Sequence, residues 1–178
     1  MIRKIKEVQK ALEAGCYHCA LALVLTFPDI CGSIAYPELK GTGKSKERYE
    51  KWYDEYVALY YNFGDEKFPN GTDILINGYA CYLLRCAYLH NGCYDFKKEN
   101  PEVKISKFNL HYDKHTLLMG SYNSVNTSDF SLDVDVSGLC GAICRATTDF
   151  YNKHKEQFED ELILDYGWDD KVFDSIFS

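Results

Sequence analysis

The sequence of 178 residues lacks any long apolar run. Its longest uninterrupted apolar stretch, residues 20–25, is far shorter than the roughly 20 residues that a membrane-spanning helix needs. The apolar core of a signal peptide is also missing, because Glu7, Lys10 and Glu13 follow the charged first residues. We therefore expect a soluble, cytoplasmic protein that has no membrane partner.

Two ligand-binding motifs begin in the sequence but are not completed. Cys16-Tyr17-His18-Cys19 has the spacing of half a zinc site, yet no second pair of Cys or His residues closes a tetrahedron. Gly41-Thr42-Gly43-Lys44-Ser45 resembles the end of a phosphate loop, but residue 38 is glutamate where such a loop needs glycine. We therefore predict no metal site, no phosphate loop and no cofactor.

Neither an internal repeat nor a break in composition divides the chain. With 178 residues and 46% hydrophobic side chains, it is long enough for one domain with a substantial core. We predict a domain over residues 1–158 and a separate acidic segment over residues 159–178. The eight cysteines are expected to remain free thiols, since the chain is long and carries no secretion signal.

Positive charge is in deficit, with 20 Lys and Arg against 27 Asp and Glu. This balance counts against nucleic-acid binding, but eight acids and one lysine within residues 156–174 account for the whole excess. The basic clusters in the neutral remainder are either ordinary solvated surface or an RNA-binding patch, which the acidic segment would then shield. The candidate RNA-contacting residues are Lys44, Lys46, Arg48, Lys97 and Lys98.

Apolar residues spaced three and four apart predict about five helices. We expect Gly15 to end the first, Ser45 to cap the third, Thr72 or Asp73 to cap the fourth, and Ser137 or Gly138 to begin the last. The second is apolar nearly all round and should be central. The predicted helices cover residues 2–14, 16–32, 45–63, 72–90 and 137–158.

The third predicted helix carries a stripe of large side chains, mostly aromatic, at helical spacing. A stripe of this kind can stack RNA bases, but more often it forms a core or a dimer interface. We favour the core or interface interpretation. The stripe consists of Tyr49, Trp52, Tyr53, Tyr56, Val57 and Tyr60.

Between the fourth and the last helix the apolar pattern changes to a period of two. Strict alternation of Phe130, Leu132, Val134 and Val136 predicts one strand, and two further strand candidates precede it. We interpret them as a small antiparallel sheet within residues 103–136. The predicted fold class is mainly α: a bundle of about five helices with a small antiparallel β insertion before the last long helix.

Arg85 and His90 form the most informative pair in the chain. A permanently cationic, forked guanidinium matches a phosphate, and an imidazole that titrates near neutral pH can move protons to and from oxygen. Five positions on an ideal α-helix correspond to about 140° of rotation, so the two side chains do not share one face. Convergence on one phosphate requires the reach of the arginine, a distorted helix, or a second subunit.

Asp29 is an acid inside the apolar second helix. An unpaired buried charge is very costly, so Asp29 requires a partner, and Arg85 is one candidate.

With these features the chain resembles the HEPN superfamily, small helical-bundle proteins whose active members carry an Arg-x4–6-His motif. The resemblance covers roughly residues 5–158 and follows the helix order. Its matching pieces are Leu84-Arg85-Cys86-Ala87-Tyr88-Leu89-His90 and the apolar segment over residues 20–32.

The resemblance implies a metal-independent endoribonuclease that cuts single-stranded or loop RNA. It also implies a homodimer with one motif from each subunit at a shared cleft, in a toxin or antiviral-defence system with an antitoxin or defence partner. His90 would transfer a proton between the 2′-hydroxyl and the leaving oxygen, and Arg85 would stabilise charge on the phosphate. Asn91 would orient the backbone or the imidazole. Cys86 stands where active members commonly carry Asn, Asp or His.

Other interpretations of the same residues stay open. Arg85 can serve only as an ion-pair partner of Asp29 or as a hydrogen-bond donor to a carbonyl at the C-terminal end of a helix. His90 can cap the end of its helix, where a favourable interaction with the helix dipole stabilises it. The chain would then be a catalytically inactive HEPN-like module that binds a nucleotide, RNA or a protein partner. A third possibility is a structural dimerisation domain whose acidic segment docks on a neighbour.

Overall fold

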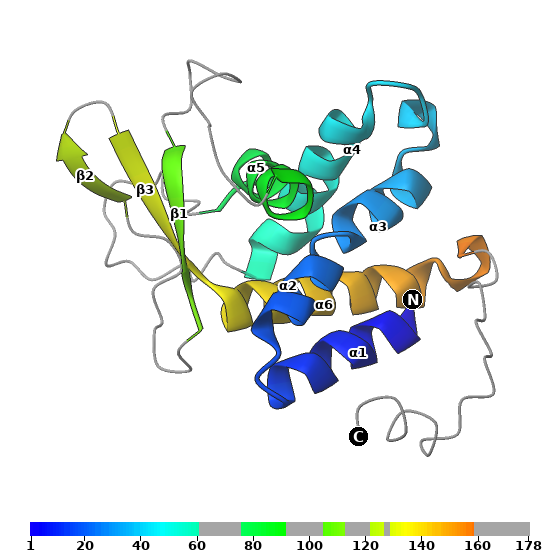
Figure 1. The fold of residues 1–178 in the computed structure, drawn as a ribbon. Helices are drawn as coiled ribbons and strands as arrows, with labels where there is room; N and C mark the ends of the chain where they lie inside the picture. The colour runs from blue at the N-terminus through cyan, green and yellow to red at the C-terminus, as the bar shows by residue number, and fades with distance from the viewer. Residues whose placement is uncertain (61–75, 92–104, 113–121, 127–128, 159–178) are drawn as a thin grey trace.

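The computed structural model describes residues 1–60, 76–91, 105–112, 122–126 and 129–158 (Figure 1). This part of the chain is mainly helical, as predicted. The predicted acidic segment, residues 159–178, lies outside the described residues, as do Lys97 and Lys98.

The first helix, α1 (Ile2–Glu13), forms where the sequence predicts it. Ile5 and Val8 are buried on its inner face, and Gly15 follows its end with a φ of 74°. That positive φ strains residues with a side chain, so the turn after α1 is best made by glycine.

The predicted single helix over residues 16–32 is wrong, because the chain forms α2 (Tyr17–Val24) and α3 (Phe27–Ala35) in its place. Pro28 lies in the first turn of α3 and has no N–H, so a continuous helix would leave a carbonyl of α2 without its donor. The hydroxyl of Thr26, in the turn between the two helices, donates to the Leu23 carbonyl at 2.7 Å. The break turns α3 away from the direction of α2 (Figure 1).

Tyr17–Ala35 is a candidate membrane span by length and composition alone, with a mean hydropathy of 1.5. In the structure 44% of this stretch is buried inside the protein, where α2 packs on α1 and α6 and α3 packs on α4 and α6. This arrangement is compatible with a soluble protein.

The third helical segment begins as α4 (Ser45–Trp52) and continues as the π-helix η2 (Tyr53–Val57) and the 3-10 turn η3 (Ala58–Tyr60). Ser45 is its first residue rather than its cap, since the preceding Lys44 occupies the cap position. The core interpretation of the aromatic stripe is confirmed for Trp52 and Tyr53, which are fully buried. The same holds for Tyr49 and Val57.

The fourth helix, α5 (Gly78–Cys86), starts later than predicted. Asn77 caps it, because its side-chain oxygen accepts a hydrogen bond from the Ala80 N–H at 2.9 Å, and the predicted caps Thr72 and Asp73 are therefore wrong. The π-helix η4 (Ala87–Asn91) continues α5 to the predicted end.

The last long helix, α6 (Val136–Lys153), lies in the middle of the bundle, where α1, α2, α3 and η2 contact it (Figure 1). Asp135 caps it by accepting the Ser137 N–H at 3.0 Å, so the helix begins at Val136, one residue before the predicted Ser137. The 3-10 turn η6 (Lys155–Gln157) follows, close to the predicted end. The short 3-10 turn η1 (Pro37–Leu39) links α3 to α4.

The sheet is mixed, so the prediction of an antiparallel sheet is wrong. Its strands are β1 (Ile105–His111), β2 (Tyr122–Asn126) and β3 (Asp129–Asp135), in the order β1-β3-β2. β3 pairs parallel with β1 and antiparallel with β2. The alternation of apolar residues correctly predicts that Leu132 and Val134 are buried. It does not predict which strands are neighbours in the sheet or whether they run parallel or antiparallel.

Gly78 allows α5 to approach α4 closely. A Cβ atom at Gly78 would lie 2.3 Å from the Glu50 carbonyl oxygen, a backbone atom that cannot rotate away. We expect Gly78→Ala to lower the free energy of unfolding by at least about 1–3 kcal/mol, because the added methyl group overpacks the contact. Urea denaturation measures this change. Gly141→Ala in α6 is the matched control: its Cβ meets nothing within 4 Å, so we expect a gain of roughly 0.5–1 kcal/mol. Equal effects of the two variants would contradict this packing.

Candidate functional site

Arg85 lies on α5, one residue before the helix changes to the π-helical η4, which contains His90 and Asn91. A π-helix bonds residues five apart, whereas an α-helix bonds residues four apart. The helix therefore changes its winding between Arg85, which is on α5, and His90, which is in the π turn. The side chains of His90 and Asn91 lie outside the part of the chain that the structure describes.

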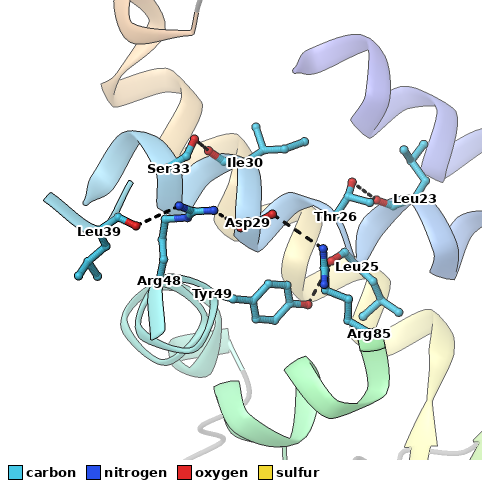
Figure 2. A network of polar contacts seen from close by, with 10 residues as sticks. All are labelled: Leu23, Leu25, Thr26, Asp29, Ile30, Ser33, Leu39, Arg48, Tyr49 and Arg85. Carbon is cyan, nitrogen blue, oxygen red and sulfur yellow. Dashed lines mark hydrogen bonds and ion pairs between the residues drawn. The ribbon is translucent and has the colours of Figure 1, made fainter. Parts of the chain in front are cut away.

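Two arginines share the carboxylate of Asp29 (Figure 2). Arg48 Nη2 lies 2.6 Å from Asp29 Oδ1, and Arg85 Nη2 lies 3.8 Å from Oδ2. Arg48 also donates from Nη1 to the Leu39 carbonyl, at 3.2 Å. The predicted contact between Asp29 and Arg85 is therefore present, but Arg48 is the closer partner of the carboxylate.

Gly32 accounts for the close approach of Arg48. A Cβ at Gly32, one turn after Asp29 on α3, would lie 2.8 Å from Arg48 Cγ and 3.0 Å from its carbonyl oxygen. The absence of a side chain lets α3 and α4 come together so that the two ionised groups meet. Sequence reasoning did not select this pair, because no pattern in the sequence indicates that α4 packs against α3 at Asp29.

The guanidinium of Arg85 lies beside two tyrosine rings. Its central carbon is 5.8 Å from the ring centre of Tyr49 and 5.9 Å from that of Tyr82. Among the described residues its Nε has no hydrogen-bond partner, and the long ion pair with Asp29 is its one salt bridge. Its side chain as a whole is 20% exposed, while Nε is buried.

The tyrosines around Arg85 stay neutral. Burial raises the pKa of Tyr49 well above its ordinary value, and its hydroxyl donates to the Leu25 carbonyl at 3.2 Å (Figure 2). Burial also raises the pKa of Tyr82, and a hydrogen bond with the half-buried Cys86 adds to the rise. Cys86 thus contacts a tyrosine that borders the arginine.

The described part of the predicted RNA-contacting cluster is largely paired with acids. Lys44 lies 2.8 Å from Glu47, and Lys46 lies 3.8 Å from Glu50. Arg48 forms an ion pair with Asp29, and only 13% of the Arg48 side chain is exposed. Each of the three described members of the cluster therefore has an acidic partner, and RNA contact by these residues stays a prediction.

An aromatic cluster of Tyr17, His18, Tyr88 and Tyr112 lies next to the turn that holds His90. The Tyr88 hydroxyl lies 2.6 Å from His18 Nδ1, and Tyr112 packs against both His18 and Tyr17. Sequence reasoning missed this cluster, since its members come from three separate segments. Only the position of Tyr88 between Arg85 and His90 links it to the motif in the sequence.

The seven cysteines that the structure describes are free thiols, as predicted. Burial raises the pKa of Cys31, Cys81 and Cys144 to about 12. These thiols stay protonated at neutral pH, and a protonated thiol is a poor nucleophile. They serve as small apolar groups in the core.

Asp54 is a partly buried acid at the junction of α4 and α5. Its Oδ1 accepts the Gly78 N–H at 2.6 Å, while burial raises the pKa of its carboxyl. Burial likewise raises the pKa of the neighbouring Glu50, and the charge of Asp54 adds to that rise. A carboxyl with a raised pKa binds its proton more tightly in the folded protein, so its charged form destabilises the fold at neutral pH.

We expect Asp54→Asn to be more stable than the parent protein at neutral pH, because it keeps an acceptor for Gly78 and removes the charge. The difference should shrink as the pH falls through the raised pKa toward the unfolded value of about 4, where Asp54 becomes neutral in both states. Urea denaturation at a series of pH values measures this. Asp54→Ala is the control, and it should lose about 1–3 kcal/mol because the buried N–H loses its acceptor. A less stable Asp54→Asn protein at neutral pH would contradict the prediction.

Comparisons of the chain with protein-family models, with curated proteins and with solved structures give no match.

Proposed function

We propose that this protein is a metal-independent endoribonuclease of the HEPN type, with Arg85 and His90 as its catalytic pair. The observation that carries the proposal is the π-helical turn Ala87–Asn91, because it changes the winding of the helix between Arg85 and His90, and a distorted helix is one way for the two side chains to converge. Single π turns inside α-helices occur frequently at functional sites.

Arg85 would stabilise the charge that develops on the phosphate. Its partial exposure, its long contact with Asp29 and the neutral tyrosines beside it support this role, because they hold the guanidinium without saturating its donors. A forked donor group aimed at a phosphate is a strong and geometrically specific ligand.

His90 would act as the general acid or base. In the first step the 2′-oxygen loses its proton and attacks the adjacent phosphorus, the bond to the 5′-oxygen of the next nucleotide breaks, and that oxygen takes up a proton. An imidazole can perform either transfer near neutral pH. Asn91, the next residue on the same turn, would orient the backbone or the ring.

We propose that the protein acts as a homodimer with one motif from each subunit at a shared cleft, in a toxin or defence system. Leu89 supports a subunit contact at this position, since it lies in the π turn and is 37% exposed. It is one of two large apolar side chains that are exposed in the described residues, the other being Leu59. An exposed apolar side chain at the motif suits a surface that a second subunit covers.

The experiment that tests this proposal is RNA cleavage by the purified protein in excess EDTA. We expect cleavage of single-stranded RNA to persist in EDTA, with products that end in a 2′,3′-cyclic phosphate and begin with a 5′-hydroxyl. A substrate with one 2′-deoxynucleotide at the cut site is the matched control and should stay intact, because it lacks the attacking oxygen. Cleavage that EDTA abolishes, or that the deoxy substitution leaves unchanged, would contradict the proposal.

The second candidate function is a catalytically inactive module that binds RNA, a nucleotide or a protein. The negative charge of Asp29 beside Arg85 favours it, because a carboxylate at 3.8 Å weakens the attraction of the guanidinium for a phosphate. RNA binding without cleavage in the same experiment would select this function.

A further inference from the structure

The aromatic cluster brings together three segments that are distant in the sequence. Tyr17 and His18 begin α2, Tyr88 lies in η4, and Tyr112 directly follows β1. The ring centres of Tyr17 and Tyr112 are 5.4 Å apart, and those of His18 and Tyr112 are 5.3 Å apart. The rings therefore form one continuous group beside the turn that holds His90.

The rings of His18 and Tyr88 join edge to edge. Their planes differ by 6°, and their centres are 6.1 Å apart. A hydrogen bond of 2.6 Å links the edge of the imidazole to the phenol hydroxyl, so the rings extend one another and do not cover one another's faces. The pair makes a flat surface that is wider than one ring.

This surface is partly open, and two of its phenols carry no charge. Burial raises the pKa of Tyr88 and that of Tyr112, so both phenols are neutral at physiological pH. His18 is exposed and the three tyrosines are half-buried. In the described part of the chain none of the four side chains forms a salt bridge. A flat aromatic surface fits the face of a nucleobase, because every base has a π-face that can stack on a ring.

We propose that the aromatic cluster binds an unpaired nucleobase next to the cleaved phosphate. The inference rests on the proposed function and deepens it, because it explains a preference for single-stranded RNA: a base can stack on a protein ring only when it is not enclosed in a duplex. Tyr88 is on the same continuous helical segment as Arg85 and His90, so the cluster lies within one turn of the motif along the helix. The phosphate would meet the arginine while the base meets the rings.

The test compares two short oligouridylates of equal length and charge, one with its bases and one fully abasic. Both carry 2′-O-methyl groups so that they are not cleaved, and the full-length protein is titrated against each. The native protein should bind the base-containing strand more tightly. Tyr88→Leu and Tyr112→Leu should each weaken that binding by about 5- to 100-fold, the usual effect of losing one stacked ring, and leave the abasic affinity unchanged.

Two further variants separate stacking from a structural role. Tyr88→Phe keeps the ring and loses the hydrogen bond to His18, so it should retain most of the base-dependent affinity. Tyr151→Leu removes a half-buried ring on α6, outside the cluster, and should bind like the native protein. Equal affinity for the two strands, or a loss in Tyr88→Phe as large as in Tyr88→Leu, would overturn the inference.

The outcome for the base site is separable from the outcome for the proposed activity. Cleavage in EDTA together with binding that ignores the bases would overturn the base site and leave the ribonuclease proposal in place. Base-dependent binding by a protein that does not cleave RNA would support the base site and overturn the ribonuclease proposal.

Discussion

Arg85→Ala and His90→Ala should each reduce RNA cleavage by a factor of about 10²–10⁴ while the protein stays folded. Loss of a general acid or base typically costs about 10²–10⁴ in rate, and loss of a donor that stabilises transition-state charge costs about 10²–10³. Single-turnover cleavage of one RNA at saturating protein concentration measures the chemical step separately from binding.

Matched variants outside the motif check the specificity of this result. Arg145 is an exposed arginine on α6, and Arg145→Ala should cleave like the parent protein. His154 lies just after the end of α6, and His154→Gln should do the same. Circular dichroism and thermal unfolding establish that each variant is folded. Cleavage by Arg85→Ala or His90→Ala at the parent rate would remove the pair from the mechanism.

Arg85→Lys is a sharper variant of the same experiment. Lysine keeps the positive charge but offers a point donor in place of a planar fork. If the fork contacts the phosphate, we expect Arg85→Lys to cleave more slowly than the parent protein and faster than Arg85→Ala. Parent-like cleavage by Arg85→Lys would mean that the charge alone matters.

Arg48→Ala should lower cleavage about tenfold, and a second substitution, Asp29→Asn, should restore most of it. Arg48 holds Asp29 at 2.6 Å, whereas Arg85 lies 3.8 Å from the other carboxylate oxygen. Without Arg48, the carboxylate would pair with Arg85 and reduce the attraction of that guanidinium for the phosphate. Asn at position 29 removes the negative charge, so Arg85 becomes available again. A coupling of this size, roughly 1.4 kcal/mol, is usual for residues in one ion-pair network.

The double variant also distinguishes two roles of Arg48. If Arg48 binds RNA directly, as the basic cluster suggests, Arg48→Ala will raise KM and Asp29→Asn will not restore cleavage. If Arg48 positions Asp29, the single variant will lower kcat and the double variant will recover it. Lys44→Ala is the control for loss of one positive charge from the same surface, since Lys44 is exposed and pairs only with Glu47 among the described residues.

The helical class of the fold was predictable because it depends on neighbours in the chain. The faces of α1 and α6 follow from apolar residues three and four apart, and buried Ile5, Val8, Leu139 and Ile143 confirm them. The break between α2 and α3 was missed, although Pro28 marked it, because the apolar pattern continues across the break. The sheet was predicted as antiparallel because alternation carries no information on strand order.

The candidate site was predictable only in part. The sequence showed Arg85 and His90 on the last turns of a helix, and it raised Asp29 as a buried acid that needs a partner. It did not show Arg48 as the closer partner, because a contact across 19 residues depends on the packing of α3 on α4 through Gly32. It showed no link between His18 and Tyr88, which are 70 positions apart.

The sequence by itself determined the mainly helical class, the helical spacing of the aromatic stripe and the position of the Arg and His motif at a helix end. These features depend on side-chain periodicity and on spacing within a few turns. The tertiary structure alone decided the π turn inside the motif, the pairing of Asp29 with two arginines, the mixed sheet and the aromatic cluster. Each of these depends on which surfaces pack together, and packing is a property of the whole chain that no local pattern encodes.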